Sequence, residues 1–132
     1  MPAMPKYQFT CEVEPQYLSE QSSARENVYA FAYTITVTNT GDVAAQLIAR
    51  HWVITDANDH TDEVKGLGVV GNQPLLQPGE SFRYTSGTRL PTPSGTMHGS
   101  FFCVAEDGER FDCPVLAFQL LADGAAPART LH

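Results

Sequence analysis

A ten-residue alternation places the strongest constraint on how this chain can fold. From Tyr29 to Thr38, large apolar residues take every second position, and small or hydroxylated residues take the positions between them. Side chains of a β-strand point alternately to its two faces, so this pattern separates an apolar face from a polar one. The segment is therefore predicted to be a half-buried antiparallel strand. Its apolar row consists of Tyr29, Phe31, Tyr33, Ile35 and Val37.

The rest of the chain consists of further short apolar segments, separated by turn-forming residues. These segments lie at 7–13, 47–56, 68–70, 81–86, 97–105 and 111–121. No stretch of ten or more residues combines helical periodicity with the absence of a breaker, so the crossover helices of a parallel sheet are missing. Short strands at such spacings are typical of a sandwich or barrel. The prediction is one all-β domain, an antiparallel sandwich of about seven or eight strands.

Charge and hydropathy exclude several classes of partner. The 15 acidic and 8 basic side chains give a formal net charge of −7, which repels nucleic acid and anionic lipid. No apolar run approaches the 18 residues of a membrane span, and the N-terminus does not resemble a signal peptide. We therefore expect a cytoplasmic protein that binds neither nucleic acid nor membranes.

Three cysteines cannot all pair within one chain, so we expect reduced, structural thiols. Around Asp107–Gly108, a two-residue turn would pair Cys103 with Asp112. A loop with one more residue would bring Cys103 opposite Cys113, and we favour that register because it keeps charged side chains off the apolar face.

A glycine motif, GxGxxG, occupies Gly66, Gly68 and Gly71. In nucleotide-binding proteins such a motif ends a strand and opens a helix that holds the phosphates. Here Asn72, Gln73 and Pro74 follow, and they cannot begin a long helix. The motif is interpreted as a bend, while an anion-binding turn of backbone amides stays open as an alternative.

The segment 47–56 has two apolar rows, one containing Arg50 and the other His51, so its buried face is ambiguous. The acidic stretch after it lacks the pattern of a calcium loop and is predicted to be a solvated turn. Nothing in the sequence forms a catalytic set or a metal site, so we expect no enzyme activity and no cofactor. The candidate partner-binding residues are Arg50, His51, Asp56, Asp59 and Asp62.

Several segments together resemble the ApaG family, in its order and spacing, over nearly the whole chain. They are Arg-His-Trp-Val-Ile-Thr-Asp-Ala-Asn at 50–58, the glycine motif through Gln73-Pro74, Pro78-Gly79-Glu80 with Phe82 and Tyr84, Met97-x-Gly99-x-Phe101, Gly108-x-x-Phe111, and Phe118-x-Leu120. The chain departs from the family in having Pro114 before Val115-Leu116 instead of an Ile-Pro pair at those two positions.

The resemblance implies a fibronectin type III-like sandwich, a single domain over residues 1–132 with a core at about 7–121. The ends at 1–6 and 122–132 are predicted to be flexible, since the tail after Leu121 shows no strand pattern. The resemblance also implies that the chain is a bacterial relative of CorD, a protein linked to cobalt resistance and magnesium efflux. Related domains in larger proteins resemble protein-binding modules. Two functions stand as hypotheses: a non-catalytic module for an unidentified protein partner, or a binder of pyrophosphate, nucleotide or another small anion at Gly66, Gly68 and Gly71.

Overall fold

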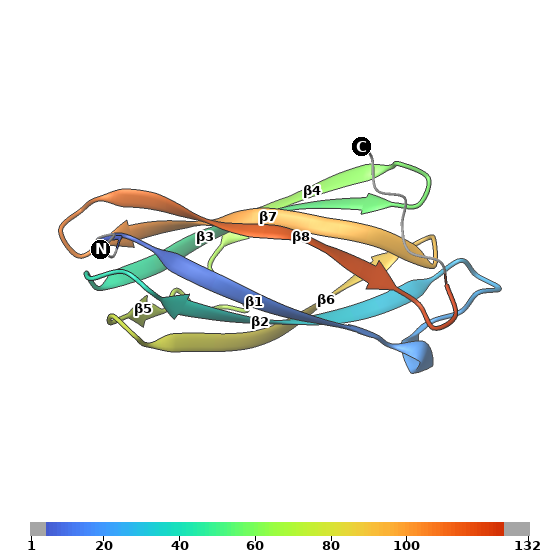
Figure 1. Ribbon diagram of the computed structural model, residues 1–132. Coiled ribbons are helices and arrows are strands. Elements are labelled where there is room, and N and C mark those ends of the chain that lie inside the picture. Colours follow the sequence, from blue (N-terminus) through green and yellow to red (C-terminus); the bar gives the residue numbers. More distant parts are fainter. Residues whose placement is uncertain (1–4, 126–132) are drawn as a thin grey trace.

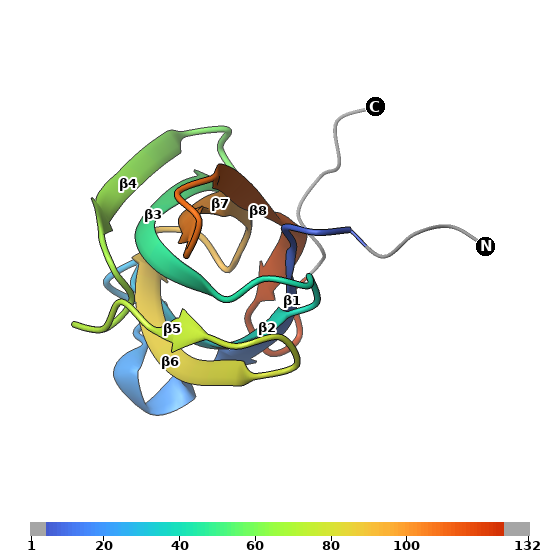
Figure 2. The ribbon, with the colours of Figure 1, turned by 90° about the vertical axis from the view of Figure 1, so that its left-hand side faces the viewer.

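The computed structural model describes residues 5–125 as two antiparallel sheets packed face to face (Figures 1 and 2). The first sheet has the order β1-β2-β6, formed by Phe9–Tyr17, Tyr29–Asn39 and Ser81–Leu90. The second has the order β4-β3-β7-β8, formed by Thr61–Leu67, Ala45–Asp56, Ser94–Ala105 and Arg110–Leu121. The short β5 (Leu75–Leu76) also pairs with β3, and a 3₁₀ turn, η1 (Ser19–Gln21), joins β1 to β2. The predicted antiparallel sandwich is confirmed.

Strand β2 shows the two-faced character that its sequence predicts. Phe31, Tyr33, Ile35 and Val37 are all buried, and Ile35 and Val37 are fully so. On the opposite face, hydroxyl groups pair with those of β6, as in the 2.8 Å hydrogen bond between Thr34 and Thr85. Strand β2 is also the central strand of its sheet, because it pairs with β1 on one side and β6 on the other.

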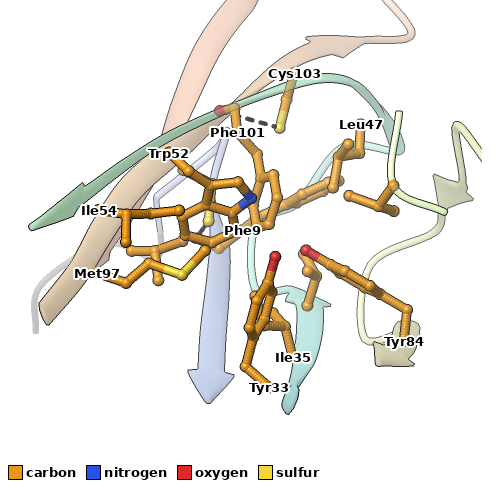
Figure 3. Packing of buried hydrophobic residues seen from close by; sticks show 14 of the residues in the cluster. Phe9, Tyr33, Ile35, Leu47, Trp52, Ile54, Tyr84, Met97, Phe101 and Cys103 are labelled. Carbon is orange, nitrogen blue, oxygen red and sulfur yellow. Dashed lines mark hydrogen bonds between the residues drawn. The ribbon is translucent and has the colours of Figure 1, made fainter. Parts of the chain in front are cut away.

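The core between the sheets is built around Trp52 of β3 (Figure 3). Its ring meets Phe101 edge to face at a centroid distance of 5.5 Å, and Tyr33 of the other sheet at 5.9 Å. Such edge-to-face pairs are favourable beyond the area they bury. Gly99 lies opposite Trp52 in β7, where a Cβ atom would collide with the backbone of His51.

A β-bulge explains why the two apolar rows of β3 were ambiguous. The register with β7 shifts between Leu47 and Ala49, which places one extra residue in β3 at that point. Leu47 is buried before the bulge, and Trp52 and Ile54 are buried after it. Each row is therefore buried over part of the strand, as a bulge reverses the facing of everything beyond it.

Three expectations about local structure were wrong. The acidic stretch is not only a turn, since β4 begins at Thr61, and residues 68–70 form a turn rather than a strand. In the β7–β8 hairpin Cys103 pairs with Phe111, and Cys113 pairs with Phe101, so neither considered register occurs. Both cysteines nevertheless share the buried face, as the favoured register required.

The two sheets meet along β1 and β8, which lie side by side although they belong to different sheets (Figure 2). After β8, Ala122 is buried and its amide donates to the carbonyl of Pro93. Of the predicted flexible ends, 1–6 and 122–132, residues 1–4 and 126–132 lie outside the described residues. Within residues 5–125, no helix has the length and apolar character needed to cross a membrane.

Candidate functional site

The three acidic candidates lie in or beside the turn between β3 and β4, but in different roles. Asp56 is 7% exposed, and its Oδ1 accepts hydrogen bonds from the amides of Asn58 and His60 at 2.8 and 3.0 Å. That carboxylate closes the turn. Asp59, with a φ of 63°, and Asp62 are both exposed, so their charges face solvent.

His51 lies on the outer face of the second sheet, away from Arg50. Its Nε2 is 3.5 Å from Oε2 of Glu63, an ion-pair distance when the imidazole is protonated. The residue directly opposite His51 in β4 is Lys65, and Glu63 is opposite Val53. The structure therefore places the two adjacent candidates, Arg50 and His51, on opposite faces of one strand.

The glycine motif forms a tight two-residue turn after β4. Val69 and Asn72 exchange backbone hydrogen bonds of 2.8 and 2.9 Å, and the residues between them, Val70 and Gly71, have φ values of 42° and 83°. Two consecutive positive φ angles are the signature of a type I′ hairpin turn. At Gly68, with a φ of 65°, a Cβ atom would lie 2.5 Å from the carbonyl oxygen of Asn72.

Arg50 fixes this turn to the sheet. Its Nη1 donates to the carbonyl oxygens of Leu67 and Gly68, each at 3.0 Å, and its guanidinium lies against Gly66. The amide of Gly68 donates to the carbonyl of Ile48, also in β3. The carbonyl groups of the turn thus face the guanidinium of Arg50, and several of its amides donate to backbone carbonyls. A phosphate-binding loop instead directs free amides at its ligand.

Three apolar side chains project around the turn, and we call them the apolar rim: Leu67, Val70 and Leu75. They are 75%, 53% and 57% exposed. Leu67 lies opposite Ala49 of β3, and Leu75 lies opposite Gln46 of the same strand. This group was not predicted from the sequence, because the exposure of single leucines and valines depends on where the edge of the sheet lies.

Strand β4 is a free edge of the second sheet and differs from the edges on the opposite side of the sandwich. Its seven residues contain no proline, and all except Gly66 are exposed. By contrast, β1 contains Pro15, and β8 contains Pro114 and an irregular register with β7. Proline and bulges obstruct the pairing of an edge with a further strand, so β4 is a more open edge than β1 or β8.

The site as a whole combines an open edge, an apolar rim at one end and exposed carboxylates at the other. Among residues 5–125, no three His, Cys, Asp or Glu side chains gather in a group suited to a metal ion. The arrangement can offer backbone hydrogen bonds, apolar contacts and negative charge to a ligand.

Comparison with known families agrees with the resemblance in the sequence. The model of the ApaG domain matches residues 19–105. The chain belongs to the ApaG family. Protein ApaG of Acidovorax sp. (strain JS42) is 69% identical over 121 residues, covering 90% of this chain and 88% of that protein. Protein ApaG of Ralstonia nicotianae is 57% identical over 98% of this chain and 100% of its own length.

Solved structures extend the likeness to the fold of this ApaG-family chain. A Bordetella pertussis protein solved under the name ApaA superimposes with a TM-score of 0.89 and 52% identity, covering 94% of this chain and all of that one. A second structural neighbour has a TM-score of 0.85 at 44% identity. The sandwich is therefore the fold of the family.

Proposed function

We propose that this ApaG-family protein is a non-catalytic binding module of the bacterial cytoplasm whose partner is another protein. In this proposal, an extended segment of the partner adds to the open edge of β4. Its apolar side chains contact the rim of Leu67, Val70 and Leu75. A role in cobalt resistance or magnesium efflux would then be exerted through the partner.

The observation that carries the proposal is the free, proline-free edge of β4, ending at an apolar rim. Unpaired amides and carbonyls of an edge strand bind an extended peptide through main-chain hydrogen bonds, and neighbouring pockets or side chains provide specificity. Apolar anchors in such interfaces supply much of the binding energy. The turn held by Arg50 keeps these anchors in a fixed position, which reduces the entropy lost on binding.

Charge at the other end of β4 indicates what the partner contains. Asp59, Asp62 and Glu63 are exposed near the start of the strand, and the chain carries a net charge of −7. A partner segment with basic residues at one end and apolar residues at the other would complement this order. Such complementarity acts mainly on the rate of encounter and on specificity.

Capture from a bacterial lysate, with identification by mass spectrometry, tests the proposal. Serine at both Leu67 and Leu75 should abolish retention of the partner and leave the melting temperature close to that of the wild type. Leu116→Ser is the matched control, because Leu116 is 84% exposed on β8. The proposal fails if the wild type retains no protein above background, or if the rim and control variants behave alike.

A further inference from the structure

Two of the three cysteines lie in direct contact. The Sγ atoms of Cys11 and Cys113 are 3.2 Å apart, although the residues are separated by 102 positions in the sequence. A disulfide requires about 2.05 Å between the sulfurs, so the two Sγ atoms would need to approach each other by about 1.2 Å to form one. Neither cysteine takes part in a disulfide in the structure.

The contact lies where the two sheets meet. Cys11 belongs to β1 and Cys113 to β8, the edge strands that run side by side without pairing. Between these strands is a groove of about 550 Å³, lined by Cys11 together with Val13, Pro114 and Val115. Cys11 is half-buried and reaches this groove, whereas Cys113 is fully buried behind it.

Cys103 differs from this pair although it lies on the same face of the β7–β8 hairpin as Cys113. It is fully buried, and the weak hydrogen bond from its Sγ goes to the carbonyl of Phe101 at 3.8 Å. The Sγ of Cys113 instead lies 3.2 Å from both Cys11 and the carbonyl oxygen of Phe9. Both of these contacts are to β1.

We propose that Cys11 and Cys113 form an oxidisable dithiol that hydroperoxides convert to a disulfide joining the two sheets. Cys11, on the groove, attacks one peroxide oxygen: its sulfur becomes a sulfenic acid, the O–O bond breaks, and the other oxygen leaves as water or an alcohol. The thiol of Cys113 then attacks the sulfenic sulfur. The S–S bond forms, the S–O bond breaks, and the hydroxyl leaves as a second water.

The two steps differ in rate for a physical reason. The hydrogen bond to Cys113 and burial raise the pKa of Cys11 far above its ordinary value, so little thiolate is present at neutral pH. The first step is therefore slow and accelerates as the pH rises. The second step is fast, because the attacking sulfur is already in contact with the sulfenic sulfur.

The test treats the purified full-length chain with hydrogen peroxide and counts free thiols after denaturation. The wild type should fall from three thiols to one, lose about 2 Da, and give a Cys11–Cys113 cross-linked peptide in non-reducing mass spectrometry. Reduction with dithiothreitol should restore three thiols. The rate of thiol loss should increase between pH 7 and pH 9, as expected for a thiol with a raised pKa.

Variants identify the pair. Cys103→Ser should fall from two thiols to none, while Cys11→Ser should form no intramolecular disulfide at the same dose. Cys11→Ala gives the same answer without adding a buried hydroxyl. The proposal is overturned if the wild type keeps three thiols, if peroxide yields only sulfinic or sulfonic acids, or if the cross-link contains Cys103.

Discussion

The guanidinium of Arg50 lies directly over Gly66, the residue opposite it in β4. A Cβ atom at Gly66 would be 2.8 Å from both terminal nitrogens of Arg50. A side chain at position 66 would therefore displace the guanidinium of Arg50 from this position. This relationship gives the motif a structural role that involves no ligand.

Removing the guanidinium should loosen the turn. Arg50→Met keeps much of the side-chain volume but leaves the carbonyls of Leu67 and Gly68 without their charged donor. We expect a loss of about 1–2 kcal/mol in the free energy of unfolding, measured by urea denaturation, because both bonds come from a charged group at a partly exposed site. Arg50→Lys should cost less. Equal stability of both variants and the wild type would contradict this role.

The turn also contains a strained residue. Val70 has a φ of 42°, a conformation that β-branched residues rarely adopt, and Gly71 follows with a φ of 83°. Val70→Asn should raise the free energy of unfolding by about 1 kcal/mol, because asparagine tolerates the left-handed region. Gly71→Ala should lower it by about as much through strain alone, since no atom of the described residues lies within 4 Å of the added Cβ. Thermal denaturation of the two variants measures these opposite shifts.

The apolar row of β2 supports the core from the smaller sheet. Ile35→Ala and Tyr33→Ala should each reduce the free energy of unfolding by about 2–5 kcal/mol, the range for truncation in a packed core. Ile35 is fully buried, and the ring of Tyr33 packs against Trp52. Thr36→Ala on the opposite face is the control and should change stability little. Neutral results at both Tyr33 and Ile35 would remove this row from the core.

Strands that bury one face could be predicted from the sequence, and strands that bury neither could not. In β2 one parity is apolar, so the alternation reveals both the strand and its inward face. In β4 six of seven residues are exposed, so its sequence, Thr-Asp-Glu-Val-Lys-Gly-Leu, shows no alternation to detect. The short β5 exists only because β3 offers an edge beyond the glycine turn.

Hairpin register depended on contacts that lie outside the hairpin. Gly108, with a φ of 90°, takes the left-handed position of the β7–β8 loop, and the amide of Ala105 donates to the carbonyl of Glu109. Glu106 is held in the loop by a hydrogen bond from its amide to the carbonyl of Ala44. The local sequence contains no sign of that distant carbonyl, so it could not fix the register.

The candidate site was predicted only in part, for a similar reason. Exposed acidic residues near the start of β4 were identified from composition, and Asp59 and Asp62 are exposed in the structure. The role of Arg50 was not, because its side chain bonds to backbone carbonyls that only the folded chain brings near. Asp56 instead bonds to amides two and four residues further along the chain, a local turn contact that an aspartate before a turn can indicate in the sequence.

The glycine turn should bind nucleotides no more tightly than the millimolar range, where binding supplies only about 4 kcal/mol. No helix follows Gly71 as far as residue 125, where the described part of the chain ends, and the amides of Gly68, Val69 and Asn72 all donate to backbone carbonyls. Isothermal titration with ATP, diadenosine polyphosphate and pyrophosphate measures this affinity. Micromolar binding that Gly68→Val abolishes, in a variant shown to remain folded, would instead establish an anion site at the motif.

Negative charge beside β4 should accelerate association with the partner. Asp59→Asn combined with Asp62→Lys removes this charge, and asparagine preserves the positive φ that position 59 requires. The association rate should fall and lose most of its salt dependence, because screening acts on exposed charges, while the melting temperature stays nearly unchanged. Glu12→Lys combined with Asp123→Asn changes the net charge equally at exposed positions away from β4, and it should leave the rate closer to that of the wild type. Surface plasmon resonance at several salt concentrations compares the association rates of the variants. Equal slowing by both pairs of substitutions would attribute the effect to net charge rather than to this site.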